Sequence, residues 1–407
     1  MSLPPLRQGS AQFPEMHVLM LTGDLAATAG GPPQVMFETA RALGRMGVRI
    51  TLMALGTAAP TPADAAFGDL PITIERFARD GIARLYKSRA MRRAIARRIA
   101  DFDVLHVHGV WEGCLGDAAA IFERAGKPVF VSAHGMLDPW SLRQSRWRKR
   151  LALKLLGTGR MLARARAIVF ATEEESANAR HLGATRHAIV PNGLDLDALA
   201  LAIGGDAAPL LNRAAFLAQP GRTILYFSRI HPKKGLDLLA DAFCGVAASY
   251  PDVRLLILGI PQDADYQAKI AARIEAAGLT SRVGFITDLY GKTAKPALRH
   301  ASLFALPSHQ EGFSIALLEA LGAGLPVLIT DQCHLPEVAA WDAGRVVPDD
   351  AAGIARGLAE LLALDEAQLA EMGTRGRKGV SRHFSLDHVA DLLAALYRDG
   401  CVRESAS

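Results

Sequence analysis

The stretch from Pro307 to Asp331 constrains the fold of this chain more than any other. It reads PSHQEGFSIALLEALGAGLPVLITD. Apolar residues recur at helical spacing from Ile315 to Leu321, a Gly-containing turn follows, and the short run VLIT has the character of a strand. The pattern therefore predicts a loop, a helix, a turn and a strand in succession.

Two carboxylates, Glu311 and Glu319, lie eight positions apart around the start of this predicted helix. In a continuous helix they would be offset by about 12 Å along the axis, which is enough to hold one extended ligand at two points. A purely structural alternative exists, in which Ser308 and Glu311 form a capping box and Glu319 is a solvated helix residue. The rest of the chain favours the binding interpretation.

Composition indicates a globular protein of two or three domains, because 50% of its 407 residues are hydrophobic and 21% are charged. The four cysteines are widely spaced, which predicts a reducing compartment and no structural zinc. No signal peptide or membrane span is evident, so we expect a cytoplasmic protein, or one bound peripherally to the inner face of the cytoplasmic membrane. A net charge of +5 is compatible with phosphate-bearing ligands, anionic lipid or nucleic acid.

A strand-like segment from Met16 to Leu21 is followed by a Gly-rich turn and a helical pattern, which predicts the start of a parallel sheet covered by helices. Gly30 and Gly31 lie in that turn. Open α/β sheets bind ligands at this end of their strands, although two glycines also suit an ordinary tight turn. The turn is not a G-x-G-x-x-G fingerprint, which argues against a dinucleotide.

Two basic runs occur in the first half of the chain, at residues 84–99 and 143–156. In the first run Met91 and Ile95 form an apolar stripe opposite a row of arginines, and the second run contains Trp147 among its basic residues. Basic amphipathic helices with tryptophan suit the surface of an anionic membrane. The alternative is a solvated face above an ordinary core stripe.

Three histidines lie at the carboxyl ends of predicted strands. His106 and His108 belong to VLHVHG, and His134 ends VFVSAH. That end of a parallel strand suits a ligand-binding histidine, although a lone histidine is more often structural. His134 is the strongest candidate because the loop GMLDPW follows it.

Arg229 and Lys234 lie in the predicted strand-to-helix turn SRIHPKKG. Arginine can hold a phosphate through two bonds and lysine acts as a point charge, so the pair suits a diphosphate. Backbone amides at residues 313–315, at the amino end of the helix, can add donors. With Glu311 and Glu319 these groups form a set in which cations suit phosphates and carboxylates suit hydroxyls.

The order of the elements predicts an α/β protein with two Rossmann-like α/β/α halves, at residues 1–200 and 222–383. Glycine and proline gather between them at residues 201–221, where we expect a linker. The last segment, residues 384–407, is expected to contain a helix that packs back onto the first half.

The chain contains five motifs in order: AGGPP, SAHGMLDPWSL, VPNGLD, SRIHPKKGLDLL and PSHQEGFSIALLEALGAGLPV. Together they resemble the retaining glycosyltransferases of family four, whose fold is GT-B, and the resemblance covers nearly the whole chain. HGMLDPWSL especially resembles bacterial enzymes of exopolysaccharide and lipopolysaccharide assembly. The resemblance implies that the two Rossmann-like domains face each other across a cleft.

The resemblance also implies a role for each candidate residue. Glu311 would bind hydroxyls of the donor sugar and Glu319 the ribose of the nucleotide. Arg229 and Lys234 would hold the diphosphate, and His134 would lie near the reacting carbon. Further substrate contacts are implied at Gly30, Gly31, Phe285, Ile286, Gly312, Phe313, Ser314 and Ile315, with the backbone at Phe285 or Ile286 against the base.

Two positions depart from the family pattern. Ser314 stands where many relatives have glycine, so the phosphate contact there can differ. Thr287 and Asp288 replace a glycine that frequently follows the preceding strand, which leaves the base specificity open.

The reaction implied is transfer of a hexose from a nucleotide-diphosphate sugar to an acceptor hydroxyl, with retention at the anomeric carbon. The acceptor would be a lipid-linked or growing saccharide of the cell surface. No carboxylate is placed as a nucleophile, which favours a front-face displacement. The D-x-D sequences at residues 101–103 and 263–265 fall in loops beside strands, so we expect neither a metal nor another cofactor.

Two alternatives stay open from the residues alone. One is an enzyme of the same fold with different chemistry, such as a sugar-nucleotide epimerase or a phosphorylase. The other is a non-catalytic polybasic protein that binds membrane or nucleic acid, which would leave both glutamates without a purpose. We expect no nucleic-acid partner, because neither an RNA-binding motif nor stacked aromatic residues are present.

The site assignment makes a first prediction. Replacing Lys234 or Glu311 by alanine is expected to abolish sugar transfer and to leave thermal unfolding nearly unchanged, since both residues are assigned to substrate. A transfer assay and a melting curve on each variant check this, and full activity in either variant would contradict the assignment.

Overall fold

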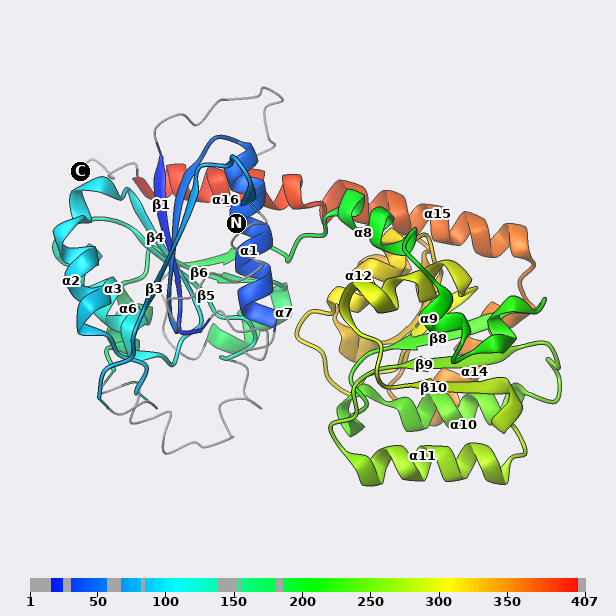
Figure 1. Ribbon diagram of the computed structural model, residues 1–407. Helices are drawn as coiled ribbons and strands as arrows, with labels where there is room; N and C mark the ends of the chain where they lie inside the picture. The colour runs from blue at the N-terminus through cyan, green and yellow to red at the C-terminus, as the bar shows by residue number, and fades with distance from the viewer. Residues whose placement is uncertain are drawn as a thin grey trace. The chain divides into compact units, whose positions relative to one another are not determined.

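The protein divides into two compact units, each an α/β unit with its own parallel sheet (Figure 1). The first unit comprises Met1–Gly193 and Val389–Ser407, and the second comprises Leu194–His388. The computed structural model describes residues 16–24, 31–56, 67–81, 85–137, 153, 156–180 and 186–401.

The sheet of the first unit has seven strands in the order β3-β2-β1-β4-β5-β6-β7, all parallel. The strands are β1 (His17–Thr22), β2 (Arg49–Leu55), β3 (Ile72–Phe77), β4 (Val104–His108), β5 (Val129–Ser132), β6 (Ala167–Phe170) and β7 (His187–Ile189). All six residues of β1 are buried, which accords with the continuous apolar runs of strands covered on both faces. The order reverses between β1 and β4, which places a topological switch point beside the histidines of β4.

Helices cover both faces of this sheet. They are α1 (Gly31–Arg45), α2 (Arg89–Arg97), η4 (Ile99–Asp101), α3 (Gly113–Arg124), α6 (Thr158–Arg164), α7 (Glu173–Ala179) and most of α16 (Leu386–Cys401), where η denotes a 3₁₀ helix. Leu105 and Val107 of β4 pack with α2, α3 and α6 in one core. The alternating His106 lies on the other face, where its Nδ1 is 2.6 Å from the hydroxyl of Tyr397 on α16. The C-terminal helix therefore returns to the first unit, as the sequence predicts.

The first basic run contains α2 (Arg89–Arg97), and the two faces of this helix differ in burial. Met91 and Ile95 are buried in the core, while the four arginines of the helix are exposed. The apolar stripe is therefore used inside the protein and is not available to enter a bilayer. The second run, residues 143–156, lies outside the described residues except at Leu153 and Leu156. Within the described part of the chain, no helix has the length and apolar character needed to cross a membrane.

The second unit has a six-stranded parallel sheet in the order β10-β9-β8-β11-β12-β13. The strands are β8 (Thr223–Phe227), β9 (Arg254–Leu258), β10 (Val283–Ile286), β11 (Leu303–Leu306), β12 (Val327–Thr330) and β13 (Gly344–Val347). Its longer helices are α8 (Leu196–Ile203), α10 (Leu236–Val246), α11 (Ala264–Ala276), η9 (Gly291–His300), α12 (Ile315–Gly322), α14 (Ala351–Ala363) and α15 (Glu366–His383). Figure 1 shows α10 and α11 on one side of β8, β9 and β10, and α8 and α12 on the other.

Short helices complete the second unit. They are α9 (Ala208–Leu211), η6 (Ala215–Ala218), η7 (Pro232–Lys234), η8 (Thr280–Arg282), η10 (Asp331–Cys333) and α13 (Glu337–Ala340). The structure differs here from the linker expected at residues 201–221, because this segment folds as helical turns of the second unit. Leu210 and Ala214 are buried in its core, and Arg299 donates to the carbonyls of Ile203 and Gly205 over 2.7 and 3.0 Å. Gly204 caps the end of α8 and Pro209 lies in the first turn of α9, while the buried apolar residues hold the segment in the core.

His106 gives the first unit a dependence on pH. Burial lowers its pKa to about 3, whereas histidines of an unfolded chain titrate near 6.5. Between these values the unfolded state binds a proton that the folded state does not. We therefore expect this residue to lower the free energy of unfolding by up to about 1.4 kcal/mol per pH unit below about pH 6.5.

Urea denaturation of the wild type and of His106→Gln between pH 7 and pH 5 checks this expectation. Glutamine keeps hydrogen-bonding atoms between Tyr397 and Ser132, the two partners of His106, but does not titrate. The free energy of unfolding of the variant is expected to fall less steeply as the pH is lowered. The difference in slope should correspond to about one proton. If the free energy of unfolding has the same slope against pH in both proteins, His106 does not contribute to this pH dependence.

Candidate functional site

The turn after β8 is held against the loop after β11 by a glycine. Gly235 has φ +63°, and a Cβ atom at this position would lie 1.8 Å from the carbonyl oxygen of Pro307. Only glycine permits so close an approach together with a left-handed conformation. This contact brings the turn HPKKG, with Lys234, next to the loop that carries Glu311.

Lys234 and Glu311 form an ion pair at this point. Each residue is only 9% exposed. The same carboxylate oxygen, Glu311 Oε1, also accepts the hydroxyl of Ser308 over 3.1 Å, and Ser308 is fully buried. Two of the residues predicted from the sequence are therefore in direct contact, and a charge-assisted hydrogen bond fixes the carboxylate.

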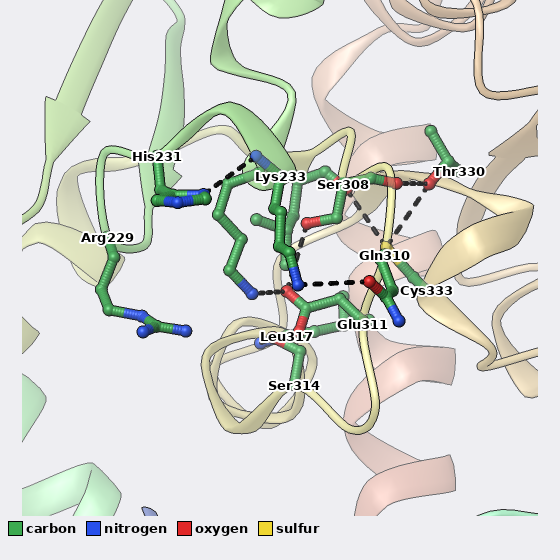
Figure 2. A network of polar contacts seen from close by, with 12 residues as sticks. Arg229, His231, Lys233, Ser308, Gln310, Glu311, Ser314, Leu317, Thr330 and Cys333 are labelled. Carbon is green, nitrogen blue, oxygen red and sulfur yellow. Dashed lines mark hydrogen bonds and ion pairs between the residues drawn. The ribbon is translucent and has the colours of Figure 1, made fainter. Parts of the chain in front are cut away.

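A buried layer supports the Glu311 loop from behind. The hydroxyl of Thr330 donates to the carbonyl of Ser308 (Figure 2). Cys333 Sγ donates to the carbonyl of Leu306 over 3.3 Å. The amide of Glu311 donates to the carbonyl of Gln332 over 3.1 Å. Burial, and the Glu311 carboxylate to a smaller extent, raise the pKa of Cys333 to about 12, so this thiol is a packing group and not a nucleophile.

Arg229 lies in the same turn as Lys234. Its carbonyl accepts the hydroxyl of the buried Tyr226 over 3.0 Å, and its guanidinium donates to Gln262 over 3.2 Å. Lys233 also donates to a glutamine side chain, because its ammonium lies 3.3 Å from Oε1 of Gln310 in the loop of Glu311 (Figure 2). The turn therefore supplies three cations to one edge of the sheet.

Glu319 is buried in α12 and is 8% exposed. It forms an ion pair with Lys295 of η9, and the ammonium of Lys295 lies 4.8 Å from the centre of the Phe227 ring. The sequence does not predict the contact of Lys295 with Glu319, because no periodicity links two residues that are 24 positions apart. The solvated interpretation of Glu319 is wrong.

The helix α12 begins at Ile315 with Ser314 as its cap. The hydroxyl of Ser314 accepts the amide of Leu317 over 3.3 Å, which gives this departure from the family pattern a local structural role. The capping box proposed for Ser308 and Glu311 is therefore wrong. Gly312 is exposed and Phe313 is half-buried, so the loop presents backbone ahead of the helix.

The strand β10 carries the residues expected near the base. Ile286 is buried, and its carbonyl accepts the amide of Gly259 over 3.1 Å, whereas Phe285 is half-buried. At the end of this strand Asp288 accepts two bonds from Arg213 Nε, over 3.0 and 2.9 Å. These bonds lower the pKa of Asp288, and this second departure from the family pattern is thus paired within the second unit.

His134 lies two residues after β5, in a strained conformation with φ +49°. Its Nε2 lies 3.1 Å from His108 Nδ1. Burial lowers the pKa of His134 to about 4, so the imidazole is neutral at pH 7. The next residue, Gly135, donates its amide to Glu175 over 2.5 Å, and the same carboxylate accepts the amide of Ala171 over 2.8 Å. Glu175 therefore holds the loop that orients His134.

Two glycines of the first unit, Gly30 and Gly31, are also predicted to contact substrate. Gly30 lies outside the described residues, and Gly31 is the first residue of α1.

Both D-x-D sequences carry structural bonds, since Asp103 accepts the amide of His17 over 2.8 Å and Asp263 caps α11. Among the described residues, no group of three His, Cys, Asp or Glu side chains is arranged to hold a metal.

Comparison with known proteins places these two units in a family. Residues 29–198 match Glycosyltransferase Family 4, and residues 212–379 match Glycosyl transferases group 1. A phosphatidyl-myo-inositol mannosyltransferase of Mycobacterium leprae is 30% identical over 303 residues, which are 70% of this chain and 71% of that protein. The chain belongs to glycosyltransferase family 4.

Other relatives agree with this family-4 glycosyltransferase assignment. A D-inositol 3-phosphate glycosyltransferase of Jonesia denitrificans is 27% identical over 402 residues and matches 92% of both chains. A glycosyltransferase of Rickettsia africae has a TM-score of 0.74 at 14% identity, over 96% of this chain and 100% of that one. The Anabaena protein HepE in complex with UDP and glucose has a TM-score of 0.72 at 17% identity, over 94% and 100%. The fold is GT-B, its units are two Rossmann-like domains, and the enzyme is a retaining transferase.

Burial of the Lys234–Glu311 pair revises the stability expected for its variants. Removing one partner leaves the other charge uncompensated in the interior, which typically costs about 3–5 kcal/mol. We expect Lys234→Met to be strongly destabilised, and the double variant Lys234→Met/Glu311→Gln to recover most of that loss because no lone charge remains.

Urea denaturation of the single and double variants measures this difference. Glu360→Gln is the matched control, because Glu360 pairs with Arg345 in the same domain but its side chain is 48% exposed. Exposed pairs contribute about 0–1 kcal/mol, so this control should change little. If Lys234→Met has the same free energy of unfolding as the wild type, the buried pair does not contribute to stability.

Proposed function

We propose that this glycosyltransferase moves a sugar from a nucleotide-diphosphate sugar to an acceptor hydroxyl with retention, using a donor site in its second domain. The observation that carries the proposal is the buried Lys234–Glu311 pair beside Arg229. Cations for a diphosphate and a fixed carboxylate for sugar hydroxyls are thereby supplied at one edge of the sheet. That edge, at the carboxyl ends of parallel strands, is where α/β sheets bind nucleotides.

Lys234 can bind the Glu311 carboxylate and the diphosphate at the same time. An ammonium has three N–H donors, and Glu311 occupies one of them. The others can hold the diphosphate oxygens, together with the guanidinium of Arg229. The amides of Gly312, Phe313, Ser314 and Ile315, which precede and begin α12, would add neutral donors at the positive end of the helix dipole.

The second glutamate and the edge strand are assigned to the nucleoside. Glu319 would bind the ribose, and Phe285 or Ile286 would lie near the base. Because the carbonyl of Ile286 already accepts a bond within the sheet, the backbone of Phe285 is the better base contact.

Retention in this proposal needs no enzymatic nucleophile. The bond between the anomeric carbon and the diphosphate oxygen breaks, and the acceptor oxygen bonds to the same face of that carbon. The acceptor proton passes to the departing diphosphate, whose charge Lys234 and Arg229 stabilise. His134, neutral at pH 7, would contribute a hydrogen bond near the reacting carbon and not a positive charge.

The charge chemistry of the proposal rests on side-chain cations, with neither a metal nor another cofactor. The aspartates of the D-x-D sequences support this choice, because Asp103 and Asp263 bond to backbone amides.

The relatives support a class of donor and a class of acceptor. HepE is solved with UDP and glucose, and two relatives are named for D-inositol 3-phosphate and phosphatidyl-myo-inositol. We therefore place the acceptor among polyols and saccharides carried on phosphate or lipid, and a lipid-linked or growing saccharide of the cell surface fits this class. Gly30 and Gly31 would lie beside the phosphates and the acceptor.

Contact with an anionic membrane surface on the cytoplasmic side is part of this proposal. The exposed arginines of α2 suit it, and the burial of Met91 and Ile95 makes that contact purely electrostatic. It would therefore weaken as salt is added.

A donor panel tests the proposal. UDP-, GDP- and ADP-sugars are screened for a rise in melting temperature, and the product formed with an acceptor is analysed by NMR for its anomeric configuration. We expect one nucleotide class to stabilise the protein and the product to keep the donor configuration. Arg229→Gln should lower kcat/KM about 100- to 1,000-fold, as expected when one preorganised charge is removed.

The controls separate this chemistry from its alternatives. Glu360→Gln should retain wild-type activity, because its exposed pair lies on β13 and α14. An epimerase would convert the donor without any acceptor, and a phosphorylase would require inorganic phosphate. Either result, or an inverted product, would contradict the proposal.

A further inference from the structure

The donor domain contains a second buried lysine–glutamate pair, and no role in the reaction has been given to its lysine. Lys295 lies in η9 and Glu319 in α12. Their side chains are 15% and 10% exposed, and Glu319 Oε2 accepts the ammonium of Lys295. This pair is nearly as enclosed as Lys234 and Glu311, whose side chains are 11% and 8% exposed.

The surroundings of Lys295 hold it in place. Its neighbours Ala294, Pro296 and Ala297 are buried, so the turn that carries it is fixed in the core. Its ammonium lies 4.8 Å from the centre of the Phe227 ring, a distance at which a cation is attracted to an aromatic face. The lysine is therefore oriented by an aromatic ring and by a carboxylate at the same time.

The position of the pair relates it to the donor site. Phe227 is the last residue of β8, and Arg229 follows it two positions later in the turn that carries the cations. Glu319 stands in the helix whose amino end follows the Glu311 loop. Lys295, Glu319 and Phe227 thus meet at the sheet edge where the turn with Arg229 and Lys234 begins.

We propose that Lys295 is a positioning residue for the nucleotide: it fixes one carboxylate oxygen of Glu319, so that the other is presented to the ribose hydroxyls of the donor. The proposal rests on the proposed function, which assigns the ribose to Glu319. It adds that selectivity for the ribose depends on a lysine from another element. A carboxylate free to rotate would lose much of that preference, because its ordering would then oppose binding.

The test compares three ligands that differ only in the sugar of the nucleotide. Affinities for UDP, 2′-deoxy-UDP and 3′-deoxy-UDP are measured by calorimetry, or for the corresponding diphosphates of whichever base the wild type binds. We expect the wild type to prefer the ribonucleotide over at least one deoxy form by about tenfold or more, as for the loss of a hydrogen bond to a charged group. In Lys295→Met the preference should fall below about threefold although Glu319 is still present.

Further variants keep the test independent of folding. Lys295→Met leaves the Glu319 charge alone in the interior, so its unfolding is measured together with that of Lys295→Gln and Lys295→Arg. Lys295→Arg retains the charge and is expected to keep more of the ribose preference than Lys295→Gln. The double variant Lys295→Met/Glu319→Gln should recover stability without recovering the preference. Glu360→Gln is the control with an exposed pair and should match the wild type.

Two results overturn the proposal in distinguishable ways. If Lys295→Met and Lys295→Gln weaken ribo- and deoxynucleotides by the same factor, the lysine has only a structural role, and the proposed function is unaffected. If Glu319→Gln leaves the ribose preference intact, the assignment of Glu319 to the ribose fails, and this part of the proposed function fails with it.

Discussion

Compensation of buried charge is the constraint on which the second domain depends. Glu311 and Glu319 are both nearly removed from solvent, and each is matched by a lysine from a different element of the fold. Lys234 comes from the turn after β8, and Lys295 comes from η9. Because a lone charge in such a position is strongly unfavourable, these elements have to meet at one edge of the sheet. The same contacts therefore stabilise the domain and shape its candidate site.

Sequence patterns predicted the elements that follow from local chemistry. Continuous apolar runs marked buried parallel strands, and helical spacing from Ile315 to Leu321 marked α12. The sequence predicts a phosphate and sugar site from the turn with Arg229 and Lys234 and the loop with Glu311, and the structure brings Lys234 and Glu311 into contact. The roles assigned to these residues in the reaction stay predictions.

The remaining features depend on contacts that a linear pattern does not encode. Lys295 meets Glu319 only because the fold brings η9 and α12 together, and the intervening sequence gives no sign of this contact. Residues 201–221 contain glycines and prolines that resemble a linker, yet the pairing of Arg299 with two carbonyls ties them to the domain. Local composition alone does not reveal such tertiary bonds.

The path of α16 has a consequence for how the protein is made. The chain leaves the first domain at Gly193, builds the whole second domain, and returns at Val389 to place Tyr397 against His106. During synthesis at the ribosome, the face of the first sheet that carries His106 therefore stays uncovered until the second domain has been made and α16 emerges. The first domain starts to fold before the second domain, and it is completed only after the second domain has been synthesised.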